Sequence, residues 1–146
     1  MRRPVGVFGV GWGAPLSEAR VTLGIACEQR YAWRNASDFH VCRGQSTLIG
    51  YAAWIEVITR QERVEGILAT FIGTPCPNVA ASLRQELRLP RNVDPISLTW
   101  RSGETIRLDE TTAGCKLTVA GPRWGMQMQR EQLAQAFASV TEELRP

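Results

Sequence analysis

Residues 96–120 read ISLTWRSGETIRLDETTAGCKLTVA, and apolar and polar side chains alternate in this stretch along three short runs. Alternation is typical of β-strands that bury one face, because successive side chains of a strand point to opposite sides of the sheet. The stretch therefore predicts a three-stranded antiparallel meander with one buried face. The apolar residues that would share this face are Ile96, Leu98, Trp100, Ile106, Leu108, Cys115, Leu117 and Val119.

The same alternation predicts the register of the meander, because a slip of one residue would turn the apolar set of a strand toward water. We expect a connection of three residues, 102–104, between the first two strands. The expected pairs are Trp100 with Ile106, Leu98 with Leu108, Leu108 with Leu117, Ile106 with Val119, and Asp109 with Lys116.

The other face of the meander is polar and net basic. Arg101, Arg107 and Lys116 would lie on adjacent strands of this face, where neighbouring Cβ atoms are about 5 Å apart. Cations this close repel one another unless anions lie among them, and Asp109 offsets only one. We expect phosphate groups of a single-stranded nucleic acid to supply the other anions, and a solvated face without a ligand is the alternative. The full expected set is Thr99, Arg101, Thr105, Arg107, Lys116 and Thr118.

Length and composition describe an ordinary globular protein. The 146 residues fit one domain over 1–146, long enough to bury a core without a disulfide or metal. The net charge of +3, in which Lys116 is the only lysine among 17 basic residues, is too mild to establish nucleic-acid binding by itself. No segment approaches the ~18 apolar residues of a membrane helix. The glycine-interrupted start is not typical of a signal peptide, so we expect a cytoplasmic protein with no membrane partner.

Cysteine and histidine carry the best candidates for catalysis or metal binding. The four cysteines are widely spaced, without a C-x-x-C pair, which predicts free buried thiols in a cytoplasmic chain. His40 is the only histidine, and in an extended segment it would share a face with Cys42 and Asp38. Ligands along one strand rarely close a tetrahedral site, so we expect no metal and no cofactor. An enzyme that uses His40 and Cys42 remains an alternative.

The rest of the chain predicts an α+β fold. We expect strands near residues 5–10, 21–25, 31–33 and 64–72, and helices over 47–60, 79–87 and 126–144, the first two capped by Ser46 and Asn78. This order favours a mostly antiparallel sheet covered on one face by two or three helices, including the amphipathic C-terminal one.

Three short resemblances bear on function. Residues 74–79, TPCPNV, resemble the first half of the P-C-x-x-C motif of zinc-dependent nucleobase deaminases, but Val79 replaces the second cysteine and no H-x-E is found in the preceding helix. The order of elements is similar to that of ribonuclease H-like folds, without the carboxylates that hold their two metal ions. Residues 21–26 with Tyr31, Trp33 and 39–41 resemble single-stranded-DNA-binding OB proteins, which implies base stacking on exposed aromatic rings.

Arginine beside tryptophan in predicted loops completes the predicted binding surface. If exposed, Trp33 and Trp124 are stacking candidates, and Arg34 and Arg123 flank them. We therefore predict a non-catalytic binding module that binds single-stranded nucleic acid weakly through its arginine-rich sheet face and tryptophans. The alternative is a subunit that binds protein partners or itself, with the 126–144 helix as the contact.

Overall fold

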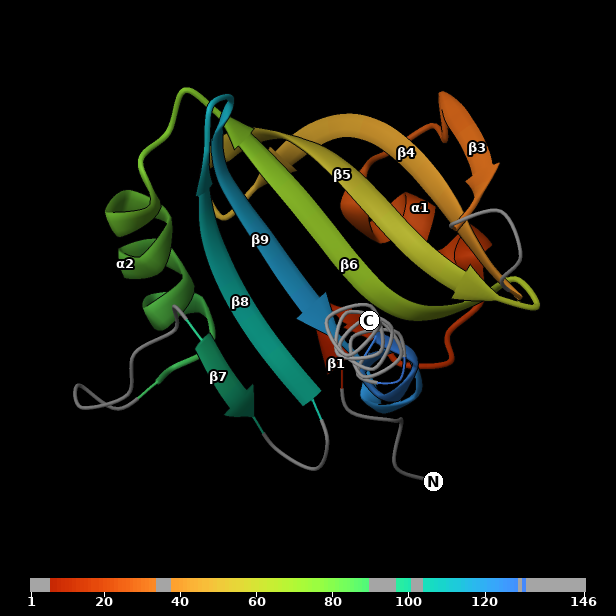
Figure 1. Cartoon of the computed structure of the whole chain (residues 1–146). Coiled ribbons are helices and arrows are strands. Elements are labelled where there is room, and N and C mark those ends of the chain that lie inside the picture. The colour runs from red at the N-terminus through yellow and green to blue at the C-terminus, as the bar shows by residue number, and fades with distance from the viewer. Residues whose placement is uncertain (1–5, 34–37, 90–96, 101–103, 129, 131–146) are drawn as a thin grey trace, which may run out of the picture.

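The computed structural model describes residues 6–33, 38–89, 97–100, 104–128 and 130, with residues 97–100 described for their backbone alone. Its main element is a seven-stranded antiparallel sheet in the order β3-β4-β5-β6-β9-β8-β7 (Figure 1). The predicted α+β class with a mostly antiparallel sheet is confirmed. The strands of this sheet are β3 (Gln29–Ala32), β4 (Phe39–Leu48), β5 (Tyr51–Arg60), β6 (Arg63–Ile72), β7 (Ser97–Trp100), β8 (Glu104–Thr111) and β9 (Gly114–Ala120).

The meander is present with most of its predicted register. Strands β8 and β9 pair as expected, with Leu108 opposite Leu117 and Asp109 opposite Lys116. Leu117 is fully buried. Between β7 and β8 the register differs by two residues, because Leu98 pairs with Ile106, and Trp100 with Glu104. A shift of two keeps every side chain on its predicted face, so alternation alone could not exclude it.

The helix predicted over 47–60 is wrong, because these residues form the end of β4, a turn and β5. Ile49 and Gly50 both have positive φ, 47° and 88°, as a two-residue hairpin turn requires. Leu48 and Tyr51 close the turn as a pair. Strand β5 lies between β4 and β6 and buries residues on both faces, so its apolar residues also match a helical spacing. The predicted central strand at 64–72 is confirmed as β6.

The strand predicted at 21–25 is also wrong. Residues 16–23 form helix α1 (Leu16–Leu23), which buries Leu16, Ala19 and Leu23 at helical spacing and leaves Val21 84% exposed. Gly24, at φ 70°, ends the helix and donates its N–H to the carbonyl of Arg20. The run before α1 forms a small hairpin of β1 (Gly6–Val7) and β2 (Val10–Gly11).

Helix α2 (Cys76–Glu86) begins directly after Pro75, three residues before the start predicted from Asn78. Within the predicted helix, Val79 and Leu83 are fully buried, and Leu87, just after the end of α2, is half-buried. In Figure 1, α1 and α2 lie toward opposite ends of the curved sheet: α1 contacts β4 and β6, whereas α2 contacts β8 and β9. Both helices and the small hairpin share one core with the sheet side chains that include Ile55, Ile67 and Leu117, and we call this side the helix face.

The opposite side of the sheet, the far face, has a smaller core formed by Phe39, Val41, Ile58, Leu68, Ala120 and Trp124. Trp124 belongs to a helical segment at residues 122–128, which begins four residues before the predicted 126–144 helix. This segment therefore covers the far face and not the face of α1 and α2. Met126, the first residue of the predicted amphipathic helix, is 54% exposed. Residues 131–146 lie outside the described chain.

The prediction of four free thiols is wrong. Cys27 is bonded to Cys42, and Cys76 to Cys115, each with a Cα–Cα distance of 4.9 Å. The first disulfide joins the loop after α1 to β4, and the second joins the start of α2 to β9. The disulfides thus attach the start of α2 and the loop that follows α1 covalently to the sheet. Apolar surroundings suit a thiol and a disulfide equally, so the sequence could not distinguish them.

Candidate functional site

The described part of the predicted basic face has one carboxylate, Asp109, among its two cations. The cross-strand pairs place Arg107 and Lys116 on the far face together with Thr105 and Thr118. Arg107 Nε lies 3.0 Å from Asp109 Oδ1, and Asp109 lies opposite Lys116 in the register of β8 and β9. Arg101, the third cation of the prediction, lies outside the described residues. The described part of this face therefore carries two cations against one carboxylate, a net charge of only +1.

An aromatic patch lies on the far face near β3, formed by Tyr31, Arg43, Trp54 and Glu56. The Arg43 guanidinium lies 4.0 Å from the centroid of the Trp54 ring, a cation–π contact. The Tyr31 hydroxyl donates to Glu56 Oε2 at 2.5 Å. Partial burial, followed by this hydrogen bond, raises the pKa of Tyr31 to about 12. Sequence reasoning missed this patch because it placed Trp54 and Glu56 in a helix.

The tryptophans predicted as exposed anchors are mostly buried. Trp124 is 0% exposed, so it cannot stack with a base, and Trp12 in the glycine-rich start of the chain is also buried. Trp33 is half-buried, and its ring packs edge-on against Trp124 with the centroids 5.3 Å apart. The two rings instead build the small core of the far face. Trp124 is buried because Gly66, on β6, has no side chain where the indole lies.

The burial of Trp124 positions Arg123, the preceding residue, at the rim of a groove of about 580 Å³. Arg60 at the end of β5 and Arg130 after the helical segment also line this groove. We call it the arginine groove, after these three residues. The lining includes one carboxylate, Asp38, whose Oδ2 lies 4.0 Å from Arg60 Nη2. The other lining residues are Phe39, Met126 and Gln127. Arg34, predicted to flank Trp33 in the binding surface, lies outside the described residues.

Glu65 is a buried carboxylate next to this groove. Its side chain is 8% exposed, and its Oε1 lies 3.8 Å from Nη1 of Arg123, whose own side chain is 72% exposed. Loss of hydration raises the pKa of Glu65 above its usual value, while Arg123 and Arg60 act in the opposite direction. The 3.8 Å separation is an ion pair without hydrogen-bond contact. Arg123 is therefore held loosely.

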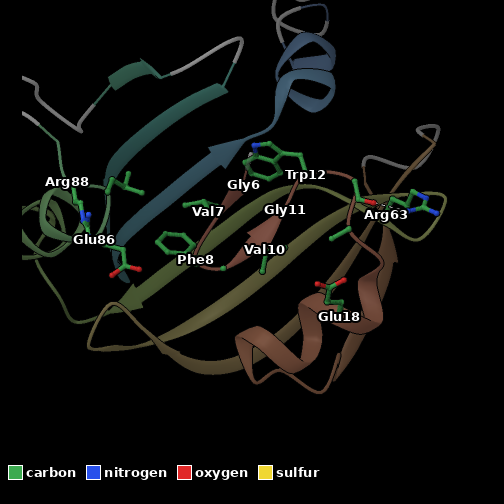
Figure 2. A pocket seen from close by; sticks show the side chains of 14 residues that line it. Gly6, Val7, Phe8, Val10, Gly11, Trp12, Glu18, Arg63, Glu86 and Arg88 are labelled. Carbon is green, nitrogen blue, oxygen red and sulfur yellow. Dashed lines mark hydrogen bonds between the residues drawn. The ribbon is translucent and has the colours of Figure 1, made fainter. Parts of the chain in front are cut away.

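A second groove, of about 710 Å³, surrounds the β1–β2 hairpin on the helix face. In Figure 2 the hairpin lies between the two helices, with Glu18 from α1 on one side and Glu86 and Arg88 from the end of α2 on the other. Trp12 also lines the groove, and its Nε1 is buried without a hydrogen-bond partner in the described structure. Acidic and basic residues are balanced here, so this groove favours no class of charged ligand.

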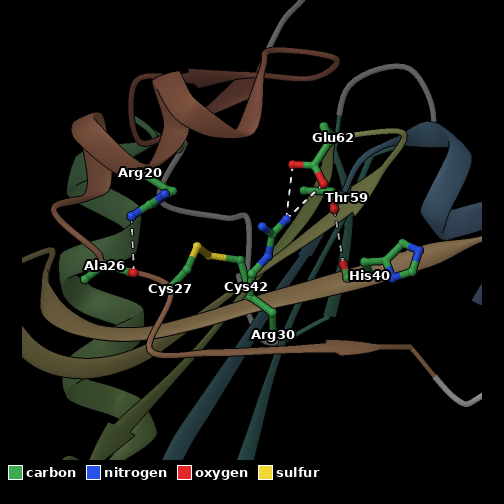
Figure 3. The surroundings of a disulfide bond; sticks show 8 residues. All are labelled: Arg20, Ala26, Cys27, Arg30, His40, Cys42, Thr59 and Glu62. Atoms are coloured by element: carbon green, nitrogen blue, oxygen red, sulfur yellow. Dashed lines mark hydrogen bonds and ion pairs between the residues drawn. A yellow bond between two sulfur atoms is a disulfide. The ribbon is translucent and has the colours of Figure 1, made fainter.

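In the alternative of an enzyme that uses His40 and Cys42, Cys42 is not available as a nucleophile. Cys42 is 1% exposed and its sulfur is bonded to Cys27, so it offers no thiolate (Figure 3). His40 is exposed, and its side chain points away from this disulfide. Within the described part of the chain, no group of three or more His, Cys, Asp or Glu side chains lies close enough to hold a metal ion.

The comparisons with known proteins add no identity: no family model, curated protein or solved structure matches the chain. Among the described helices, none combines the length and the apolar character needed to cross a membrane.

Proposed function

We propose that the protein is a binding module whose ligand is a phosphodiester anion, as in single-stranded nucleic acid, and that the arginine groove holds it. The observation that carries this proposal is the composition of the groove: Arg60, Arg123 and Arg130 line it against one lining carboxylate, Asp38. Guanidinium groups suit phosphate because their planar fork donates two parallel hydrogen bonds.

The available charge favours this groove over the basic face of the meander. Arg107 is committed to Asp109 at 3.0 Å, whereas the ion pairs of Arg60 with Asp38 and of Arg123 with Glu65 span 4.0 and 3.8 Å. The Arg60–Asp38 pair is exposed, and such pairs are worth about 0–1 kcal/mol, so a phosphate can replace Asp38 at little cost. With Trp33 and Trp124 packed on each other, recognition falls to the arginines and not to base stacking.

The direct test is binding of a fluorescent oligothymidylate, followed by anisotropy over a range of salt concentrations. Arg60→Gln and Arg123→Gln should each weaken binding, and each should reduce the slope of log K against log salt by about 0.7 for one lost phosphate contact. Arg20→Gln is the matched control, because Arg20 is exposed on α1 on the helix face. Inorganic phosphate as competitor separates a site for a single phosphate from one that needs a strand.

Two outcomes of this test contradict the proposal. The first is that the unmodified protein does not bind the oligonucleotide at low salt. The second is that Arg20→Gln weakens binding as much as Arg123→Gln does, because a diffuse charge effect would then explain the affinity without the groove.

The aromatic patch supports a second candidate function, a protein-binding or self-associating subunit. Trp, Tyr and Arg dominate the energetics of protein interfaces, and Tyr31, Arg43 and Trp54 bring these three types together on an exposed sheet face. Ile72, 56% exposed on the same face, adds apolar surface. The two disulfides are typical of oxidising compartments, where protein partners are more usual ligands than nucleic acids, so they favour this candidate too. The cytoplasmic location stays a prediction.

Sedimentation velocity tests self-association through this patch. An oligomer that is insensitive to salt, and that Trp54→Ala dissociates while Arg123→Gln does not, supports the second function. A monomer at all protein concentrations contradicts self-association through the patch.

A further inference from the structure

Glu65 occupies an irregular position in the sheet. The register between β5 and β6 shifts after Ile58, so that Gly66 pairs with Ile58 and Val64 with Thr59, and Glu65 is the extra residue. Its backbone carbonyl accepts the N–H of Gly121 at 2.9 Å, which ties this bulge to the chain leaving β9. The bulge thus places a carboxylate beneath the segment that carries Arg123.

Two cations act on this carboxylate. Arg123 from the helical segment is in ion-pair distance, and Arg60 from β5 exerts a weaker attraction. Asp38, near the start of β4, is the acidic residue facing the same groove, and it lies beside Arg60. Both cations that stabilise ionised Glu65 are therefore also two of the three arginines of the arginine groove.

We propose that Glu65 is an internal anion that competes with the ligand's phosphate for Arg123, so that binding in the arginine groove is coupled to uptake of a proton by Glu65. This inference rests on the proposed function. It adds a mode of regulation: the groove binds phosphodiesters more tightly as the pH falls.

The coupling follows from burial. Arg123 is mostly exposed and can turn to a ligand, whereas the carboxylate of Glu65 is held in place. When Arg123 turns away, an ionised Glu65 would remain buried without its nearest counter-ion, which is costly unless the carboxyl takes up a proton. At low pH the carboxyl is already protonated, and Arg123 is free for the ligand. By linkage, the ligand raises the proton affinity of Glu65 by the same factor as protonation raises ligand affinity.

The experiment measures the affinity for oligothymidylate between pH 5 and 8 at constant ionic strength, because neither the phosphodiester nor thymine titrates in this range. The wild-type affinity should rise as the pH falls, by up to about tenfold per pH unit where one proton is taken up on binding. Glu65→Gln should bind more tightly than wild type at pH 8 and lose this pH dependence. Arg123→Gln should lose it as well, since the competition needs both partners.

Two further variants serve as controls. Glu62→Gln removes a carboxylate that is 69% exposed and paired with Arg30, and it should leave the pH dependence unchanged. His40→Gln removes the one histidine of the sequence, and it should also leave the pH dependence unchanged.

The possible failures can be told apart. A wild-type protein that binds the oligonucleotide with a pH dependence that Glu65→Gln retains overturns this inference and leaves the proposed function standing. A wild-type protein that does not bind at low salt at pH 5 or pH 8 overturns both. If Glu65→Gln does not fold, Arg123→Gln decides: retention of the full pH dependence by this exposed-residue variant overturns the coupling.

Discussion

Gly66→Ala is the most informative single change, because Gly66 holds the place that Trp124 needs. An added Cβ would lie 2.6 Å from Cζ3 and 3.1 Å from Cδ2 of the indole, and closer still to Cε3. The ring cannot shift freely, since Trp124 is 0% exposed and packs against Trp33 with centroids 5.3 Å apart. The substitution must therefore displace the tryptophan from the far-face core.

The expected cost lies between two limits. Forcing an extra carbon into a packed core typically costs about 1–3 kcal/mol, and complete loss of a buried tryptophan's packing costs about 3–5 kcal/mol. Reduced chain entropy of the unfolded state returns about 0.4–1 kcal/mol when glycine becomes alanine. We expect Gly66→Ala to lower the free energy of unfolding by about 2–4 kcal/mol in urea denaturation. It should also weaken oligonucleotide binding, because Arg123 directly precedes Trp124 and would be displaced with it.

A double-mutant cycle supplies the control. In a Trp124→Ala background the clash partner is gone, so Gly66→Ala should cost less than about 1 kcal/mol there. Equal costs in the two backgrounds would refute the reasoning, and so would a Gly66→Ala protein that is as stable as wild type with unchanged tryptophan fluorescence.

Three further predictions address the rest of the fold. Leu117→Ala, which opens a cavity in the meander core, should cost about 2–5 kcal/mol in the same urea assay, and a negligible loss would contradict its burial. Ultraviolet titration should find the Tyr31 pKa near 12, and Glu56→Gln should lower it part of the way. Because the phenol ionises first in the unfolded chain, the folded protein should lose stability as the pH rises from about 10 to 12. Replacing Cys76 and Cys115 together by alanine should lower the free energy of unfolding by about 4 kcal/mol, because the disulfide closes a loop of 39 residues. Thiol reagents should not react with these cysteines in the native protein, and a stoichiometric reaction would contradict the disulfide.

Local pattern predicted the parts of the fold whose strands bury one face and expose the other. Residues 104–120 alternate cleanly, and their predicted pairing is the observed one. The same reasoning failed at residues 51–60, which are buried on both faces and whose apolar residues therefore also fit a helix. It failed at residues 21–25 as well, because Val21 reads as a strand residue in the sequence although it is an exposed residue of α1.

For the candidate site, the sequence singled out Arg123 and described the charge of the meander's polar face, but it could not group Arg123 with Arg60 and Arg130. Arg60 and Arg123 are 63 positions apart in the chain, and they meet because the segment after β9 crosses the far face near the end of β5. Trp124, beside Arg123, was predicted as an exposed stacking residue but is buried in the far-face core, because Gly66 leaves room for its indole.

The sequence by itself determined the α+β class, the meander and the faces of its strands, since strand periodicity is a property of neighbouring residues that survives any global arrangement. Only the tertiary structure decided which cysteines pair, that Trp124 is buried against Gly66, and that Glu65 lies beside Arg123. Each of these depends on contacts between residues 15 to 58 positions apart, as the pairs Cys27–Cys42 and Glu65–Arg123 illustrate. Such contacts are set by the packing of whole elements against each other, which no local pattern encodes.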